Sequence, residues 1–431
     1  MGTRRRPARL IGIVALSLLA AACTSGAPAS PSLVNGSPAP TKRAAMPKTY
    51  TLPTAAPAQA APAATKPGSD PRIEWTKGPV LWRTQWIAGW SGGYFAFKQS
   101  APDDYGVLVS SSLDGVTWTD GPRLPASEAF ARVALTEGPA GLLLLGWQQG
   151  CGEPEQLHGM WLSKDGGANW SGDLVGAFTG ATVLTVAGGA SGYVATGYTG
   201  DRQQHHSAPV AWTSKDARNW QQSTPTGSAD EEVAIYGGVS FPGGFVLAGA
   251  TWPDAEYSCT LPSTVSVWWS ADGSDWTRYV LPGGLPATKY PPQVQVYEIN
   301  GRVLVLASLL ISTQASDADH GTYLAWVSSD GRNWTSIALP FATCDMACSF
   351  GLGTFDDQGL MLTQSVVEFP DGHQLFDNTG GYAISGTTVV QLRAAGDIPV
   401  NVWATARGPK GVLVIGLEGQ SWLGVPVDTG E

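Results

Sequence analysis

Five polar segments of the chain contain side chains that could bind a ligand or transfer a proton, at residues 147–160, 198–209, 251–264, 308–322 and 365–380. All five histidines lie in these segments, together with carboxylates, an arginine and a tyrosine. Such groups suit ligand binding or acid–base chemistry, but loops also carry them simply because loops are solvated, and both interpretations stay open. The candidate ligand-binding residues are His158, Asp201, Arg202, His205, His206, Asp254, Glu256, Tyr257, Asp317, Asp319, His320, Asp371 and His373.

A short repeat must position these segments. It consists of a Ser, an Asp two residues later and a Trp just beyond, and we call its five copies the Ser-Asp turns. The Asp carboxylate can accept N–H groups of a tight turn, and the Trp can pack between neighbouring sheets. We therefore interpret the copies, about fifty residues apart, as structural clips within an array of small β units. Their Asp and Trp residues are Asp114, Trp118, Asp165, Trp170, Asp216, Trp220, Asp272, Trp276, Asp330 and Trp334.

A Gly followed by an apolar run recurs seven times and predicts one central strand in each of seven blades. The segment 75–81 parallels 118–124, the expected outer strand of the first blade, so it is expected to complete the last blade. We therefore predict an all-β fold, a seven-bladed β-propeller over residues 72–431 that is closed by an N-terminal strand. The polar segments should then gather at one end of the blades, and the Ser-Asp turns at the other.

The Ser-Asp turns resemble the Asp-box (BNR) repeat of sialidases and related β-propellers, whose pattern is Ser/Thr-x-Asp-x-Gly-x-Thr-Trp. The copy at Ser163 has the full length, the other four are one residue shorter, and Ala217 follows Asp216 in the third copy. The resemblance implies a β-propeller, and it points to two kinds of function. Sialidases hydrolyse glycosides, whereas the seven-bladed Asp-box photosystem assembly factors bind protein and catalyse nothing.

The resemblance to sialidases would imply an arginine triad for the substrate carboxylate, a Tyr nucleophile paired with Glu, and an Asp acid/base. Arg83 and Arg132 precede expected inner strands, but no third arginine accompanies them, and the Arg-Ile-Pro motif of that family is represented only by Arg72-Ile73-Glu74. The Tyr–Glu neighbours that could serve are Tyr236 with Glu231 and Glu232, and Tyr297 with Glu298.

We therefore expect a non-catalytic module that binds a protein or a glycan, with a sialidase-type exo-glycoside hydrolase as the alternative. Whether the protein is an enzyme stays uncertain at this point, although the absence of a complete site in the sequence favours binding alone. Trp147, Trp252 and Trp403 lie outside the repeat frame, and we expect them to contact a sugar or a partner.

The front of the chain predicts export. Arginines precede an apolar stretch at residues 10–22, which is too short to span a bilayer, so residues 1–22 are expected to be a signal peptide. The sequence around Cys23 resembles a bacterial lipobox, and the resemblance implies a lipidated Cys23 at the outer face of the cell membrane. An ordinary signal peptide is the alternative. Residues 23–71 are rich in Pro, Ala and Ser and predict a disordered tether.

The four other cysteines, Cys151, Cys259, Cys344 and Cys348, allow three disulfide pairings, which the sequence leaves open. We expect no metal site, because a single C-x₃-C lacks the second pair of ligands that zinc needs, and we expect no cofactor. The formal net charge of −10 disfavours nucleic acid as a partner. A monomer that meets the membrane through its lipid anchor only is expected.

Overall fold

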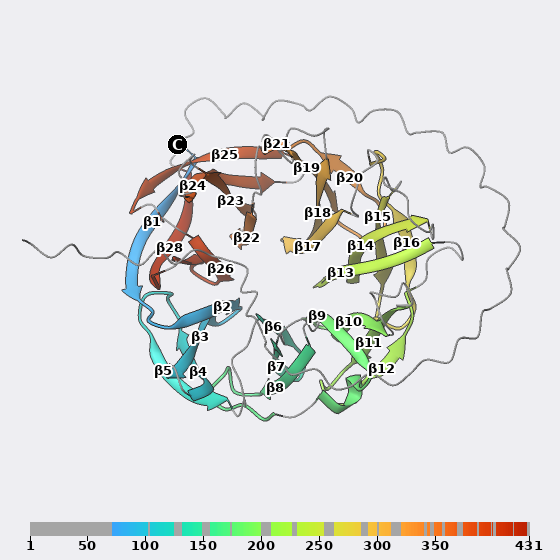
Figure 1. Ribbon diagram of the computed structural model, residues 1–431, viewed down its shortest axis with the longest axis horizontal. Coiled ribbons are helices and arrows are strands. Elements are labelled where there is room, and N and C mark those ends of the chain that lie inside the picture. The colour runs from blue at the N-terminus through green and yellow to red at the C-terminus, as the bar shows by residue number, and fades with distance from the viewer. Residues whose placement is uncertain are drawn as a thin grey trace, which may run out of the picture. The chain divides into compact units, whose positions relative to one another are not determined.

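The protein is an all-β β-propeller, and its computed structural model is drawn in Figure 1. The residues that the structure describes all belong to one compact unit. They are 71–101, 104–124, 132–148, 156–172, 175–199, 208–225, 231–253, 263–285, 292–299, 301–311, 320–339, 343–344, 349–355, 358–368, 374–385, 388–397, 399, 402–416 and 418–428.

Five of the sheets are meanders whose strands follow one another in chain order from the innermost to the outermost. The first consists of β2 (Thr84–Trp90), β3 (Gly93–Ala101), β4 (Asp104–Ser112) and β5 (Thr119–Leu124). The second consists of β6 (Arg132–Gly138), β7 (Gly141–Gln148) and β8 (Gln156–Ser163), and the 3-10 helix η1 (Val175–Phe178) follows it. The third consists of β9 (Ala181–Gly189), β10 (Gly192–Thr199), β11 (Ala208–Ser214) and β12 (Gln221–Ser223).

The fourth and fifth sheets repeat this pattern. The fourth consists of β13 (Glu231–Phe241), β14 (Gly244–Pro253), β15 (Thr264–Ser270) and β16 (Thr277–Val280). The fifth consists of β17 (Gln293–Ile299), β18 (Arg302–Ile311), β19 (His320–Ser328) and β20 (Thr335–Ile337), with β21 (Thr343–Cys344) paired to β19.

The last sheet corrects the predicted number of blades. We predicted seven separate blades, but the described residues form six sheets, because the last two repeats share one eight-stranded sheet that we call the fused sheet. The cause is a parallel pairing of β1 with β25, from Arg72 opposite Arg393 to Trp75 opposite Gly396. The strands of the fused sheet, in order, are β22 (Ser349–Phe355), β23 (Gln358–Glu368), β24 (Gln374–Ser385), β25 (Thr388–Gly396), β1 (Pro71–Val80), β28 (Gln420–Asp428), β27 (Gly411–Gly416) and β26 (Val402–Gly408).

The innermost strands close a ring. Each contacts the next, from β2 through β6, β9, β13, β17 and β22 to β26, and β26 contacts β2 (Figure 1). The N-terminal strand β1 pairs antiparallel with β28, so it lies beside the end of the chain as the closing strand. We call the end of the sheets that carries the Ser-Asp turns the turn end, and the opposite end, where one sheet leads to the next, the loop end.

The core lies between neighbouring sheets, and the second sheet shows how the sequence fills it. Successive side chains of a strand point to opposite faces, so a strand between two sheets needs apolar residues at every position. In β7, Leu142 and Leu144 pack with Phe95 of the first sheet, while Leu143 and Leu145 pack toward the third. All four leucines are at most 2% exposed. The predicted Gly-apolar runs thus form the central strands.

No helix within the described part of the chain is both long enough and apolar enough to cross a bilayer.

Candidate functional site

The Ser-Asp turns are held by hydrogen bonds within seven or eight residues. In the first turn, the N–H groups of Val116 and Thr117 donate to Oδ1 of Asp114 at 2.8 and 2.6 Å. The Ser112 hydroxyl donates to the same oxygen at 3.0 Å and accepts the N–H of Gly115 at 2.8 Å. Gly115 has a φ of 75°, in the left-handed region that favours glycine. The turn therefore satisfies the Asp114 carboxylate and the Ser112 hydroxyl with its own donors and acceptors.

The other turns repeat this geometry with one addition. In three of them an Asn side chain donates Nδ2 to the second carboxylate oxygen, from Asn169 to Asp165, Asn219 to Asp216 and Asn333 to Asp330. The backbone N–H groups of Thr117 and Val116 lower the pKa of Asp114 to about 2. Hydrogen bonds also lower the pKa of the other four turn carboxyls. These carboxylates bind their own backbone, and the arrangement suits a clip better than a catalyst.

The turns also join each sheet to the one before it. A Cβ on Gly331 of the fifth sheet would lie 2.4 Å from Trp269 of the fourth, and one on Gly273 would lie 2.7 Å from Val194 of the third. The turn Trp residues are partly buried in the clusters between sheets. Trp220 and Trp334 donate Nε1 to the carbonyls of Ala217 and Gly331 at 3.2 Å.

Most of the predicted ligand-binding residues cannot be placed. Asp201, Arg202, His205, His206, Asp254, Glu256, Tyr257, Asp317, Asp319, Asp371 and His373 lie outside the described residues, as do Cys23, Cys151, Cys259 and Cys348. The backbone of His158 lies in β8 where the pairing with β7 shifts register, and His320 begins β19. Both belong to the loop end.

The Tyr–Glu neighbours considered for hydrolysis are engaged elsewhere. Tyr297 donates its hydroxyl to Gln295 at 2.8 Å, and burial raises its pKa, so it would not ionise readily. Glu298 accepts the N–H of Gly301 at 2.7 Å and pairs with Arg407 at 3.3 Å.

Glu231, of the other Tyr–Glu neighbours, and Arg72, of the Arg72-Ile73-Glu74 string, are likewise engaged. Glu231 accepts from Arg278, whose remaining nitrogens donate to Ser266 and Thr251 at 3.1 and 2.8 Å. Arg72 pairs with Glu74 within β1 at 2.7 Å. Arg278 and Glu231 pair with each other across the fourth sheet, and Arg72 and Glu74 pair within β1, so these groups make contacts that stabilise the sheets.

The aromatic residues singled out from the sequence behave differently from expectation. Trp147 is fully buried and donates Nε1 to the carbonyl of Val183, so the expectation that it contacts a ligand is wrong. Its place at the end of β7 directs it between the second and third sheets. Trp252 is half-buried against the core of the fourth sheet, and the side chain of Trp403 lies outside the described residues.

Trp82 is a further candidate residue that the sequence did not single out. It lies in the turn from β1 to β2, at the loop end, and is 73% exposed. The N–H of Thr84 donates to the carbonyl of Leu81 at 3.2 Å, and Arg83, third in this turn, has a φ of 60°. A positive φ at the third position is the mark of a type II turn, where Gly is preferred. The backbone is therefore strained at Arg83, and the indole of the preceding residue, Trp82, is exposed to solvent.

Bulges in the innermost strands form a second irregularity at the loop end. The register shifts at Gln85 in β2, Leu184 in β9, Tyr236 in β13 and Trp403 in β26. All four occupy the same place, five residues before the last residue of the strand. Bulges redirect side chains and are common next to functional sites. Sequence reasoning could not find them, because a bulge shows only in the pairing of two strands.

The bulge at Gln85 borders the Trp82 turn. The N–H of Gln99 donates to the carbonyl of Arg83 at 3.2 Å, and the amide of Gln85 donates to the amide oxygen of Gln99 at 3.5 Å, which is a long hydrogen bond. The N–H of Leu81 donates to Gly419 at 2.7 Å, so exposed Glu418 lies close to the same turn. We call Trp82, Arg83, Gln85 and Gln99 the Trp82 site.

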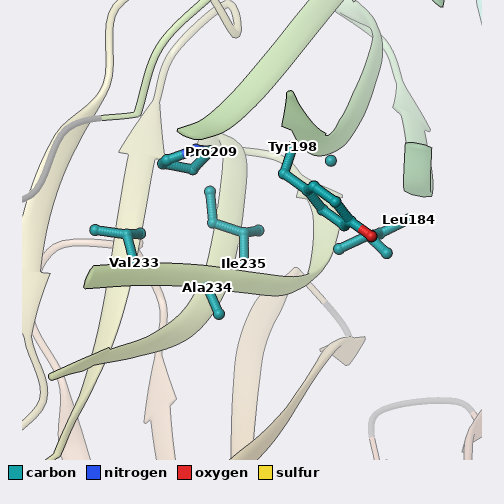
Figure 2. A pocket seen from close by; sticks show the side chains of 7 residues that line it. Leu184, Tyr198, Pro209, Val233, Ala234 and Ile235 are labelled. Carbon is teal, nitrogen blue, oxygen red and sulfur yellow. The ribbon is translucent and has the colours of Figure 1, made fainter. Parts of the chain in front are cut away.

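The bulge at Leu184 borders a recess between the third and fourth sheets, shown in Figure 2. Tyr198, Pro209, Val233 and Ile235 complete most of its wall. The recess has room for about one water molecule, so it is too small for an organic ligand. Among the described residues, no cluster of three or more His, Cys, Asp or Glu side chains could hold a metal ion.

No protein-family model matches the sequence, and no curated protein matches it. Solved structures that are similar in part include three with different activities in their names. They are a mutant of the Aleuria aurantia lectin in complex with alpha-methyl-L-fucoside (10% identity, TM-score 0.32, 75% of this chain and 95% of that chain), the β-propeller domain of the Trilobed protease from Pyrococcus furiosus (7%, 0.38, 66% and 77%), and the Bombyx mori GH32 beta-fructofuranosidase BmSUC1 (13%, 0.32, 83% and 92%). Likeness at this level carries no argument about function.

Proposed function

We propose that this chain is an exported, lipid-anchored β-propeller of the Asp-box type, and that its loop end is a non-catalytic binding module for a protein or a glycan. The observation that carries the proposal is the 73% exposed indole of Trp82 on a turn with left-handed backbone at Arg83. A positive φ at a residue other than Gly costs about 1–3 kcal/mol, but Ala217 in the third Ser-Asp turn has one as well, at 59°, so the exposed indole carries the argument. A large exposed aromatic side chain on a fixed turn is suited to binding.

Binding is favoured over hydrolysis by the hydrogen bonds of the groups that hydrolysis would need. Tyr297 donates to Gln295, Glu298 is paired with Arg407, and Glu231 is paired with Arg278. A nucleophile and its base must lie within hydrogen-bond distance of each other. Each of these side chains instead forms its hydrogen bond or ion pair with a different residue. The Trp82 site has no comparable requirement, because a binding surface needs only shape and complementary polar groups.

The direction of β1 supports a tethered arrangement. Pro71 pairs with Asp428 at the turn end, and Val80 pairs with Gln420 at the loop end. A tether formed by residues 23–71 and anchored at Cys23 would therefore join the propeller at the turn end. The Trp82 site lies at the opposite end of β1 from this point of attachment. The proposed binding module is a monomer, because the proposed site is formed within one chain.

The binding function is tested with the mature, biotinylated chain on an extracellular-protein array and on a glycan array. We expect at least one array to show binding that Trp82→Ala weakens tenfold or more. Leu113→Ala is the matched control, because Leu113 is 75% exposed in the first Ser-Asp turn at the other end. Equal binding by wild type and Trp82→Ala would refute the site, and release of free sugar from arrayed glycosides would favour the hydrolase instead.

The anchor is tested separately by growing the native host with an alkyne-bearing fatty acid. We expect the full-length chain to acquire the label and to fractionate with membranes, and the Cys23→Ser variant to do neither. An unlabelled wild-type chain, secreted into the medium, would indicate an ordinary signal peptide.

A further inference from the structure

We propose that the ligand of the Trp82 site is an uncharged carbohydrate, with one sugar ring stacked on the indole of Trp82 and its hydroxyl groups bonded to the amides of Gln85 and Gln99. This inference rests on the proposed binding function and gives it a ligand class.

The first reason is the size of the apolar surface. Among the described residues, the large apolar side chains that stand exposed at the loop end are Trp82, Val80 at 39% and Val280 at 56%. Val280 belongs to β16 of the fourth sheet, whereas Trp82 follows β1. A standard protein interface buries about 800 Å² on each partner. One indole beside one valine offers far less than that, but it matches the apolar face of a single sugar ring.

The second reason is the chemistry of the neighbours. Stacking a ring on Trp82 would bring its hydroxyl groups to the edge of the indole, where they need partners that both donate and accept hydrogen bonds. The amides of Gln85 and Gln99, one of which donates to the other at 3.5 Å, contain both kinds of group, and the backbone of Gln99 donates to the carbonyl of Arg83 next to Trp82. Both side chains are partly exposed, and the bulge at Gln85 sets its direction independently of the strand ladder.

The third reason is the absence of net charge at the bulges. The four bulged positions carry Gln85, Leu184, Tyr236 and Trp403, none of which is charged at neutral pH. Arg83, next to Trp82, and Glu418, next to the residue that accepts the N–H of Leu81, are both exposed and carry opposite formal charges. An acidic sugar or a phosphorylated ligand would need converging cations to replace its hydration, whereas a neutral sugar needs only amides and an aromatic face.

The test uses affinity electrophoresis of the mature chain through gels that contain mannan, arabinogalactan or starch, and through gels with a sialylated glycoprotein. We expect retardation by at least one neutral polysaccharide, with a dissociation constant in the millimolar range because only one ring is stacked. Trp82→Ala should lose the retardation, Trp82→Phe should keep part of it, and Gln99→Ala should weaken it several-fold. Leu113→Ala should migrate as wild type does.

The outcomes separate the two proposals. Trp82-dependent binding to a protein, without retardation by any neutral polysaccharide, would overturn the carbohydrate assignment and leave the binding module in place. Retardation by the sialylated glycoprotein alone would overturn the assignment to uncharged sugars. If wild type bound nothing on either array or in any gel, both proposals would fail. Thermal melting of each variant checks that a loss of binding does not come from unfolding.

Discussion

The turn end and the loop end of the propeller differ in how regular their backbone is, although the same strands form both. At the turn end, each Ser-Asp turn closes on its own backbone, as Asp114 does with Val116 and Thr117. At the loop end, the innermost strands bulge, as β2 does at Gln85 and β26 does at Trp403. Regularity at one end and irregularity at the other indicate that the turn end maintains the ring and that the loop end is free to vary for binding.

At the turn end, two buried tyrosines also join neighbouring sheets through hydrogen bonds of their hydroxyl groups. We call each such tyrosine with its two hydrogen bonds a clasp. Tyr94 of the first sheet donates its hydroxyl to Gly411 of the fused sheet at 2.9 Å and accepts the N–H of Lys410 at 3.2 Å. Tyr193 of the third sheet does the same with Gly141 and Ala140 of the second. Each tyrosine thus joins one sheet to the first hairpin of the preceding one.

The largest effect is expected from removing such a clasp. Tyr94 is fully buried, so Tyr94→Ala should lower the free energy of unfolding by about 3–5 kcal/mol. Tyr94→Phe should cost about 1 kcal/mol, because only the hydrogen bonds are lost. Urea denaturation followed by tryptophan fluorescence measures both, and Tyr193→Phe is the matched comparison. A loss with Phe as large as that with Ala would show that hydrogen bonding, not packing, holds the clasp.

A smaller loss is expected from opening one Ser-Asp turn. Asp216→Ala removes the acceptor for the N–H groups of Arg218 and Asn219 and should cost about 1–2 kcal/mol, as loss of a helix N-cap does. Asp216→Asn keeps one acceptor oxygen and should cost less. Asp275, the exposed residue directly before Trp276 in the fourth turn, gives the control, because Asp275→Ala should change stability by less than about 0.5 kcal/mol. Equal losses at the two positions would contradict the clip.

The sequence predicts local features of the fold better than features that depend on the pairing of distant strands. The Ser-Asp turns could be predicted because seven or eight consecutive residues contain every donor and acceptor of the turn. The number of sheets was predicted incorrectly because the pairing of β1 with β25 joins residues more than three hundred positions apart, and no local pattern encodes it. The N-terminal closing strand was recognised because its sequence repeats that of 118–124.

The loop end was harder to predict for a related reason. Trp82 resembles any Trp beside a strand, and only the three-dimensional turn shows that it is exposed while Trp147 is buried. Trp147 finds a partner in the carbonyl of Val183, which belongs to the next sheet along the chain. The sequence predicted a site of polar side chains in long segments, whereas the described part of the Trp82 site consists mainly of an aromatic residue and amides.

Acid should weaken the turn end selectively. The folded state lowers the pKa of the five turn carboxyls, with Asp114 at about 2, against about 3.9 in an unfolded chain. A depressed pKa adds stability that is present above the unfolded value and is lost as pH falls through the folded one. Melting temperature should therefore drop between about pH 4 and pH 2. Asp114→Asn should flatten this drop, and an unchanged pH profile would show that the turn carboxylates do not contribute.

The smallest stability effect is expected at the loop end, where Trp82 is mostly in solvent. Trp82→Ala should change the free energy of unfolding by less than about 0.5 kcal/mol, because little apolar contact is lost. The same change should remove ligand binding. Substitutions at the turn end would then lower stability, whereas substitution of Trp82 at the loop end would lower binding. Chemical denaturation of Trp82→Ala beside Leu113→Ala checks the first half, since both side chains are more than 70% exposed. A loss of several kcal/mol at Trp82 would mean that the indole supports the turn itself, and the contrast between the two ends would then no longer hold.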